Sequence, residues 1–153
     1  MNNPIDKLLY PPVSFHFLVS FVGAQFNPTE IRFQSVSGLE VSMETETYRE
    51  GGENRFVHTV PTRAKYSNLV CKRGLLLDSK LINWAMNSIN NLEIQPTNMV
   101  VSLLNESHLP LMTWNVVNAF PIKWSISEFN GEQSGIAIET FELYYQYFTL
   151  LKV

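Results

Sequence analysis

The residues of this chain that could perform chemistry are few and scattered. The three histidines, His16, His58 and His108, each lack a second histidine, cysteine or carboxylate at the spacing of a metal site. The one cysteine, Cys71, precedes Lys72, but on a strand these neighbouring side chains would point to opposite faces. We therefore expect no metal site and no nucleophile here, and Cys71 is predicted to pack as a small apolar residue.

Two nearby glutamates, Glu50 and Glu53, could form a carboxylate pair for acid–base catalysis. They flank Gly51 and Gly52 in a charged, exposed loop, where neither burial nor a pocket would shift the pKa of a carboxyl group. The glycine pair also lacks the Gly-Lys-Ser/Thr ending of a phosphate-binding loop, and no helical pattern follows it. The sequence therefore predicts neither an enzyme nor a cofactor site.

The loop around these glutamates is predicted to be the tip of a long β-hairpin. On both sides of it, apolar and polar residues alternate with the period of two that is typical of a half-buried strand. The apolar face before the loop would carry Leu39, Val41, Met43 and Thr45. The polar face would carry Glu40, Ser42, Glu44 and Glu46. The tip itself comprises Tyr48, Arg49, Glu50, Gly51, Gly52, Glu53, Asn54 and Arg55. A solvated surface loop is the simplest interpretation of this pattern alone.

Most of the remaining chain also predicts strands, and the spacing is typical of antiparallel hairpins. The predicted strands are Val13–Val22, Ile31–Ser37, Tyr66–Arg73, Met99–Asn105, Met112–Asn118, Ile122–Ser127 and Ile136–Phe148. Gly38 is expected to mark a bend before the long hairpin. The final strand has two partly apolar faces, which fits either a strand that also meets a neighbouring subunit or a curved strand shared by two sheets.

One segment has helical spacing. Asp78 could cap its N-terminus, and apolar residues recur every three to four positions. The predicted apolar stripe consists of Leu81, Ile82, Trp84, Ala85, Ile89 and Leu92. No linker or repeat divides the chain, so we predict a single domain over residues 1–153. Its expected fold is mainly β, an antiparallel barrel or sandwich of two sheets with one flanking α-helix.

The composition predicts a globular protein that associates with itself. Of the 153 residues 16% are charged, which is below the usual quarter, and fewer charges leave more apolar surface to be covered. The net charge of −3, without a cluster of basic residues, argues against sequence-specific binding of nucleic acid. The start of the chain lacks the features of a signal peptide, and no apolar run suits a membrane helix. We therefore expect a protein made in the cytoplasm and not inserted into a membrane.

Several sequence blocks, in order over nearly the whole chain, resemble a known family. Together they are similar to the tail-tube proteins of contractile phages, and most of all to the inner-tube proteins of phage-tail-like extracellular contractile injection systems. The combination of the loop Tyr48–Phe56 with the stretch Thr113–Pro121 is the most specific part of the resemblance. The blocks are Tyr10–Phe17, Phe33–Leu39, Tyr48–His58, Leu69–Leu75, Leu103–Glu106, Trp114–Ala119 and Glu142–Phe148.

The resemblance implies a structural subunit. Members of the family form hexameric rings that stack into a hollow tube, with sheath protein around it, spike, hub and baseplate proteins at its tip, and effector or DNA cargo in its lumen. The haemolysin-coregulated protein of type VI secretion is more distantly similar in fold. A small-ligand-binding β-barrel is the alternative interpretation of the pattern, and the main tube subunit and a tip-proximal initiator both remain open.

The resemblance also implies roles for the hairpin and the helix. The loop from Tyr48 to Arg55 would reach an adjacent subunit or ring, where its mixed charges could pair between identical copies. The polar row of Glu40, Ser42, Glu44 and Glu46 is a candidate lining of the lumen. The helix would lie on the outside, where a sheath could contact it.

Overall fold

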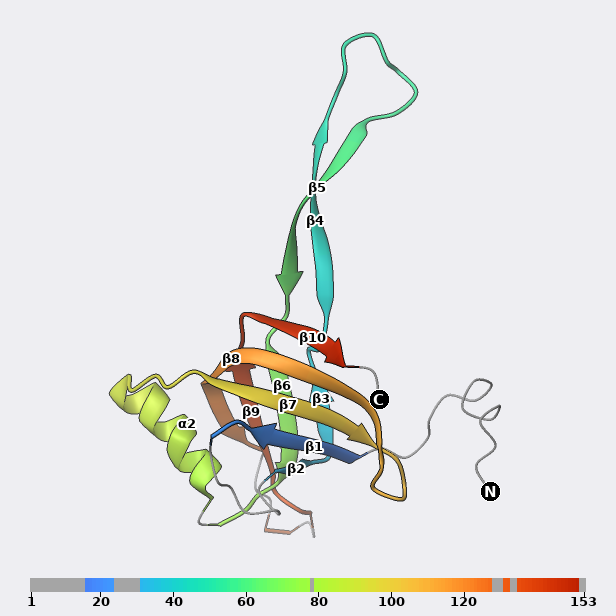
Figure 1. Ribbon diagram of the computed structural model, residues 1–153. Coiled ribbons are helices and arrows are strands. Elements are labelled where there is room, and N and C mark those ends of the chain that lie inside the picture. The colour runs from blue at the N-terminus through green and yellow to red at the C-terminus, as the bar shows by residue number, and fades with distance from the viewer. Residues whose placement is uncertain (1–15, 24–30, 78, 128–130, 133–134, 152–153) are drawn as a thin grey trace.

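The structure is a computed structural model that describes residues 16–23, 31–77, 79–127, 131–132 and 135–151. It consists of a body of antiparallel strands, a helix on the flank of this body, and a two-stranded hairpin that projects from it (Figure 1). This architecture agrees with the predicted antiparallel β fold with a flanking α-helix.

The body is one strongly curved sheet of eight strands. Its strands follow the order β2-β1-β7-β8-β9-β6-β3. The eighth strand, β10, pairs with the first half of β8 on the edge opposite β7. Their bounds are β1 (His16–Phe21), β2 (Arg32–Phe33), β3 (Ser35–Ser37), β6 (Leu69–Gly74), β7 (Thr97–Leu104), β8 (Pro110–Ile126), β9 (Ile138–Tyr144) and β10 (Tyr147–Leu151). All pairs are antiparallel, as the hairpin spacing of the sequence predicted.

The curved sheet closes through the segment predicted as the strand Ile31–Ser37. This segment is two short strands with a break at Gln34: β2 pairs with β1, and β3 pairs with β6. At the break, the Gln34 N–H donates to the Lys72 carbonyl at 2.9 Å. Because β2 and β3 are consecutive in the chain, they join the two ends of the sheet, and the body becomes a barrel.

The long strand β8 corrects one prediction. The structure joins the predicted strands Met112–Asn118 and Ile122–Ser127 into the single strand β8, which ends at Ile126. The first half of β8 pairs with β7 and β10, and the second half pairs with β9. A positive φ of 52° at Asn118 and a bulge between Pro121 and Lys123 bend this strand without ending it.

The predicted final strand, Ile136–Phe148, is divided in the structure. Its two parts, β9 and β10, are separated by Tyr145 and Gln146, and they pair with the two halves of β8. At the division the Gln146 N–H donates to the Val117 carbonyl at 3.0 Å, so the ladder continues across the bend. This geometry fits the interpretation of a curved strand shared by two parts of the sheet.

Apolar side chains fill the interior of the barrel. They come from the inward positions of all the long body strands and from the helix. The buried core consists of Val19, Phe21, Phe33, Leu69, Cys71, Leu81, Ala85, Met99, Val101, Val116, Ala119, Phe141, Leu143 and Tyr145. Burial raises the pKa of the Cys71 thiol to about 12, so this side chain stays protonated and packs as predicted.

The helix α2 (Lys80–Asn91) packs against the flank of the body (Figure 1). The predicted cap was wrong: the N-cap is Ser79, whose Oγ accepts a hydrogen bond from the Ile82 N–H at 3.4 Å, and Asp78 lies outside the described residues. Leu92, predicted on the apolar stripe, is 78% exposed because it follows the last helical residue with a left-handed φ of 56°.

The projecting hairpin consists of β4 (Val41–Tyr48) and β5 (His58–Tyr66), and we call it the arm. Among the described residues these strands pair only with each other (Figure 1). The prediction of a half-buried first strand was wrong, because none of the residues that the structure describes forms a second layer against it: Val41 is 50% exposed and Met43 is 60% exposed. Tyr66, predicted to begin the following strand, is the last residue of β5.

The expected bend at Gly38 is confirmed at the root of the arm. Its φ is +90°, a conformation that side chains rarely adopt, and a Cβ atom there would lie 1.8 Å from the Asn68 carbonyl oxygen. Glycine is therefore required where the chain leaves the body.

Candidate functional site

The tip of the arm is held in shape by its own charged residues. The turn contains Gly51 and Gly52, of which Gly52 has a φ of 100°, and the Glu53 N–H donates to the Glu50 carbonyl at 3.3 Å. Arg55 donates through its backbone N–H and its Nε to Glu53 Oε1, at 3.1 Å and 3.0 Å. These hydrogen bonds from Arg55 lower the pKa of the Glu53 carboxyl group.

An aromatic cluster next to this turn was not predicted. The His58 ring stacks on the Tyr48 ring with centroids 4.9 Å apart and meets the Phe56 ring edge-on at 5.0 Å. His58 Nε2 lies 2.9 Å from Glu50 Oε2. The sequence contained a signal for this cluster. Tyr48 and His58 stand at opposed positions on the two strands of the predicted hairpin, and opposed residues share a face.

The predicted site residues of the tip thus lie together, but its two carboxylates already have partners within the chain. Glu50 contacts His58, and Glu53 contacts Arg55. Pairing of these carboxylates with an identical neighbouring tip would have to compete with the contacts already present.

The predicted polar row lies on one side of the arm and its base, and part of its negative charge is balanced by a basic residue on β5. Glu44 accepts a hydrogen bond from Arg63 Nε at 2.5 Å, and this bond, with the charge of Arg63, lowers the pKa of the Glu44 carboxyl group. Glu40 accepts a hydrogen bond from the Ser67 hydroxyl at 3.4 Å. Ser42 and Glu46 are exposed.

Three aromatic rings fix the root of the arm to the body. The Tyr66 ring meets the Tyr145 ring at 6.0 Å and the Phe148 ring at 5.3 Å, both edge-on. The Tyr145 hydroxyl donates to the Gly38 carbonyl at 2.8 Å, and burial raises the pKa of this phenol to about 12. The direction of the arm is therefore set by contacts with the core.

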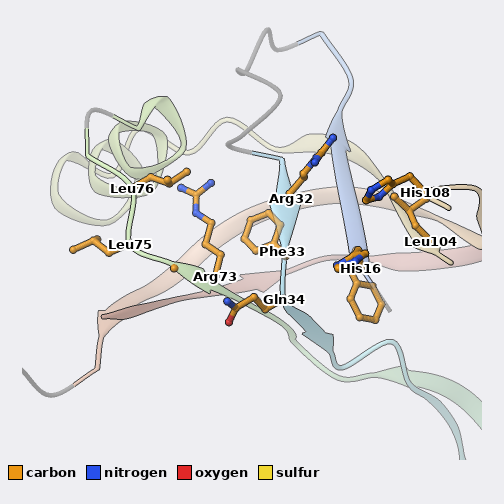
Figure 2. A pocket seen from close by; sticks show the side chains of 11 residues that line it. His16, Arg32, Phe33, Gln34, Arg73, Leu75, Leu76, Leu104 and His108 are labelled. Carbon is orange, nitrogen blue, oxygen red and sulfur yellow. The ribbon is translucent and has the colours of Figure 1, made fainter. Parts of the chain in front are cut away.

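A depression of about 360 Å³ lies between β1, β2, the end of β7 with the β7–β8 connection, and the segment after β6 (Figure 2). Arg32, His16 and His108 line one side of it, and the two imidazole rings stack at 5.5 Å. Across the described residues, no three metal-ligating side chains cluster as a metal site would require. Nor does any helix in the described part of the chain combine the length and hydropathy needed to cross a membrane.

The depression does not resemble the cavity of a ligand-carrying barrel. Such carriers hold their ligand inside the barrel, and here that volume is occupied by the side chains of the core.

Comparison with a known protein family decides between a tail-tube subunit and a ligand-carrying barrel. The family model of the T4-like virus tail tube protein gp19 matches residues 13–149, which is nearly the whole chain. The chain belongs to the T4-like tail tube protein family. Among proteins with curated annotation, none matches it.

Solved structures agree with this assignment. A chain of the anti-feeding prophage baseplate, whose cryo-EM structure is six-fold symmetrised, shares 32% identity with a TM-score of 0.80 over 94% of this chain and 97% of that one. A chain of an extracellular contractile injection system, the PVC sheath–tube complex in its extended state, shares 27% identity with a TM-score of 0.80 over 100% of this chain and 99% of that one.

A more distant structure shares the fold alone. Hcp1 from Flavobacterium johnsoniae has 12% identity and a TM-score of 0.52 over 88% of this chain and 93% of that one. The expected likeness in fold to the haemolysin-coregulated protein is thereby confirmed.

The body of this tail tube protein contains a buried ion pair that was not recognised from the sequence. Arg73 and Glu139, 2% and 0% exposed, form a salt bridge. Arg73 also donates to the Ser79 Oγ at 2.8 Å, and the Trp124 Nε1 donates to Glu139 Oε2 at 3.2 Å. The pair therefore joins β6, β8, β9 and the N-cap of the helix.

The signal for this pair was present in the alternation of the two strands. Arg73 follows Leu69 and Cys71 at inward positions of β6, and Glu139 precedes Phe141 at an inward position of β9. Two opposite charges at inward positions of different strands predict a buried pair, since an unpaired buried charge is costly.

Proposed function

We propose that this tail tube protein forms the inner tube of a contractile injection system, as hexameric rings stacked into a hollow tube. The observation that carries the proposal is the similarity, over the full length of both chains, to the protein of the PVC sheath–tube complex. The six-fold symmetrised baseplate structure supports six copies in a ring. The subunit acts mechanically, and residues 1–153 act as one domain.

The arm supplies the contact with an adjacent subunit or ring through Tyr48–Arg55. The shape of the molecule supports this proposed contact. The arm extends from the body, and the described part of the chain leaves both faces of the arm uncovered (Figure 1). If the tip of one subunit meets a different surface of the next, the contact is head-to-tail. Contacts of this kind need not form a closed ring, so stacking can continue and a filament can grow.

The partners in the assembled particle are the sheath around the tube, the spike, hub and baseplate at its tip, and effector or DNA cargo in the lumen. The polar row of Glu40, Ser42, Glu44 and Glu46 faces this lumen. The protein is made in the cytoplasm and then resides in the particle, a phage tail or a released injection system.

Negative-stain electron microscopy of the purified protein over a concentration series tests the proposal. We expect hollow rings that stack into tubes as the concentration rises. A variant in which Gly51–Asn54 is deleted should keep the body folded, as judged by circular dichroism, and should lose stacking. Monomeric wild-type particles at every concentration would contradict the proposal.

A further inference from the structure

The register of the arm divides its side chains into two different faces. Residues directly opposite each other in an antiparallel pair lie on the same face. One face carries the opposed pairs Val41 and Tyr66, Met43 and Ala64, Thr45 and Pro61, Thr47 and Thr59. The other face carries the opposed pairs Ser42 and Lys65, Glu44 and Arg63, Glu46 and Val60, Tyr48 and His58. All four charged side chains of β4 and β5 therefore lie on the second, charged face, and the first, apolar face has none.

The charged face carries groups that water solvates well, whereas the apolar face carries side chains that water solvates poorly. On the charged face Glu44 accepts a hydrogen bond from Arg63 Nε at 2.5 Å, and Lys65 lies opposite Ser42 in the register. On the apolar face Met43 is 60% exposed and Val41 is 50% exposed. A two-stranded hairpin in water is at best marginally stable without a hydrophobic layer against it. The apolar face is therefore the side of the arm that gains from being covered.

A second copy of the same chain offers a suitable cover. The body leaves large apolar side chains uncovered on its last strand, where Tyr147, Leu150 and Leu151 are 45%, 51% and 45% exposed. Association of copies would remove both apolar surfaces from water at once. A neighbour is also what the proposed tube places next to each subunit.

We propose that the apolar face of the arm is buried against a second copy of this chain in the assembled tube, while the charged face stays in contact with water. This inference rests on the proposed function, and it specifies which face of the arm makes the contact. The charges of the tip then act on the alignment of the contact, and the apolar strand residues supply its affinity.

Two neighbouring residues of β4 provide a matched test, because they are both exposed and lie on opposite faces. Met43→Glu places a carboxylate on the apolar face, and Ser42→Glu places the same charge on the charged face. We expect Met43→Glu to raise the protein concentration needed for tube formation by about tenfold or more, since it would bury an unpaired charge. Ser42→Glu should assemble as the wild type does, and so should the apolar variant Met43→Leu.

Labelling gives a second measurement that does not depend on the charged variant. Cys71 is 1% exposed, so a cysteine introduced on the arm is the reactive thiol of the folded protein. In assembled tubes, Met43→Cys should be protected from a maleimide, and Ser42→Cys should react.

The outcomes separate the inference from the function on which it rests. Tubes that form equally well with Met43→Glu, or equal labelling of both cysteines in tubes, would overturn the inference alone. A wild-type protein that never assembles would overturn both.

Discussion

At the scale of single residues, the most constrained group is the buried ion pair of the body. Arg73 lies beside the edge-on rings of Phe33 and Phe141, with its guanidinium carbon 5.3 Å and 5.2 Å from the two centroids, and it forms a salt bridge with Glu139. Every buried side-chain donor and acceptor in the described residues has a partner. Loss of one member therefore strands the other in a low-dielectric interior.

Glu139→Gln tests this pair with little change in side-chain volume. We expect it to lower the free energy of unfolding by about 3–5 kcal/mol, because Arg73 loses its counter-charge while it stays buried. The double variant Glu139→Gln/Arg73→Met should recover part of the loss. The measurement is denaturant unfolding of the monomer, and the exposed pair variant Arg63→Gln should leave the midpoint unchanged. Equal midpoints for Glu139→Gln and the wild type would contradict the assigned role.

Gly38 allows a second prediction at this scale. Gly38→Ala should lower the free energy of unfolding by at least ~2 kcal/mol, because alanine is strained at a φ of +90° and its Cβ would collide with the Asn68 carbonyl. Gly51→Ala is the matched control, since a Cβ at this position meets no atom within 4 Å. Thermal unfolding of both variants checks the difference, and similar melting temperatures would contradict it.

At the scale of elements, the arm is the part whose stability should depend most on pH. Its exposed ion pairs, Glu44 with Arg63 and Glu53 with Arg55, hold the two carboxyl groups at lowered pKa values. A lowered pKa in the folded state means that the pairs stabilise the arm above the ordinary carboxyl pKa. This stabilisation is lost as the pH falls from about 4.5 through the lowered pKa of each group.

Acidification of the monomer should therefore loosen the arm before it affects the body. We expect amide hydrogen exchange within Val41–Tyr66 to accelerate below about pH 4.5, and the core strands to keep their protection. Glu44→Gln should remove the part of this pH dependence that comes from the pair of Glu44 with Arg63. Added salt should reduce the effect, because exposed charges are screened. Exchange in the arm that is independent of pH, after correction for its intrinsic rate, would be the contrary result.

At the scale of the whole molecule, the body and the arm have different tasks. The body has a filled interior and a closed ladder, which make it rigid. The arm extends the reach of the subunit and exposes two unlike faces (Figure 1). This division suits a subunit that must hold its shape and also connect to its neighbours.

Reversal of charge on the charged face tests its proposed place at the lumen. Glu46→Lys should leave tube formation unchanged and alter the passage of charged cargo, because a face in contact with water tolerates a charge of either sign. Glu46 lies opposite Val60, so this change creates no like-charge pair with a direct cross-strand partner, unlike Glu44→Lys opposite Arg63. Electron microscopy and a cargo-loading measurement provide the two readouts. Loss of tubes would place the residue at a subunit contact instead.

The sequence by itself determined the class of fold, the approximate positions of most strands and of the helix, and the family. These properties are encoded locally, in the alternation of Phe17, Val19 and Phe21, in the helical spacing from Leu81, and in blocks such as Trp114–Ala119 that match as strings of residues. The tip of the arm could be placed for the same reason, because the pair of glycines is a local signal for reversal of the chain.

Only the tertiary structure decided which of those residues are covered. The pattern of the segment from Val41 to Tyr48 is the same whether a second layer lies against it or not, and the described part of this chain places none there. Arg73 and Glu139 are 66 residues apart in sequence, and they meet because β6 and β9 are adjacent strands. Burial and long-range pairing depend on where the strands lie in space, which a period of two along the chain does not specify.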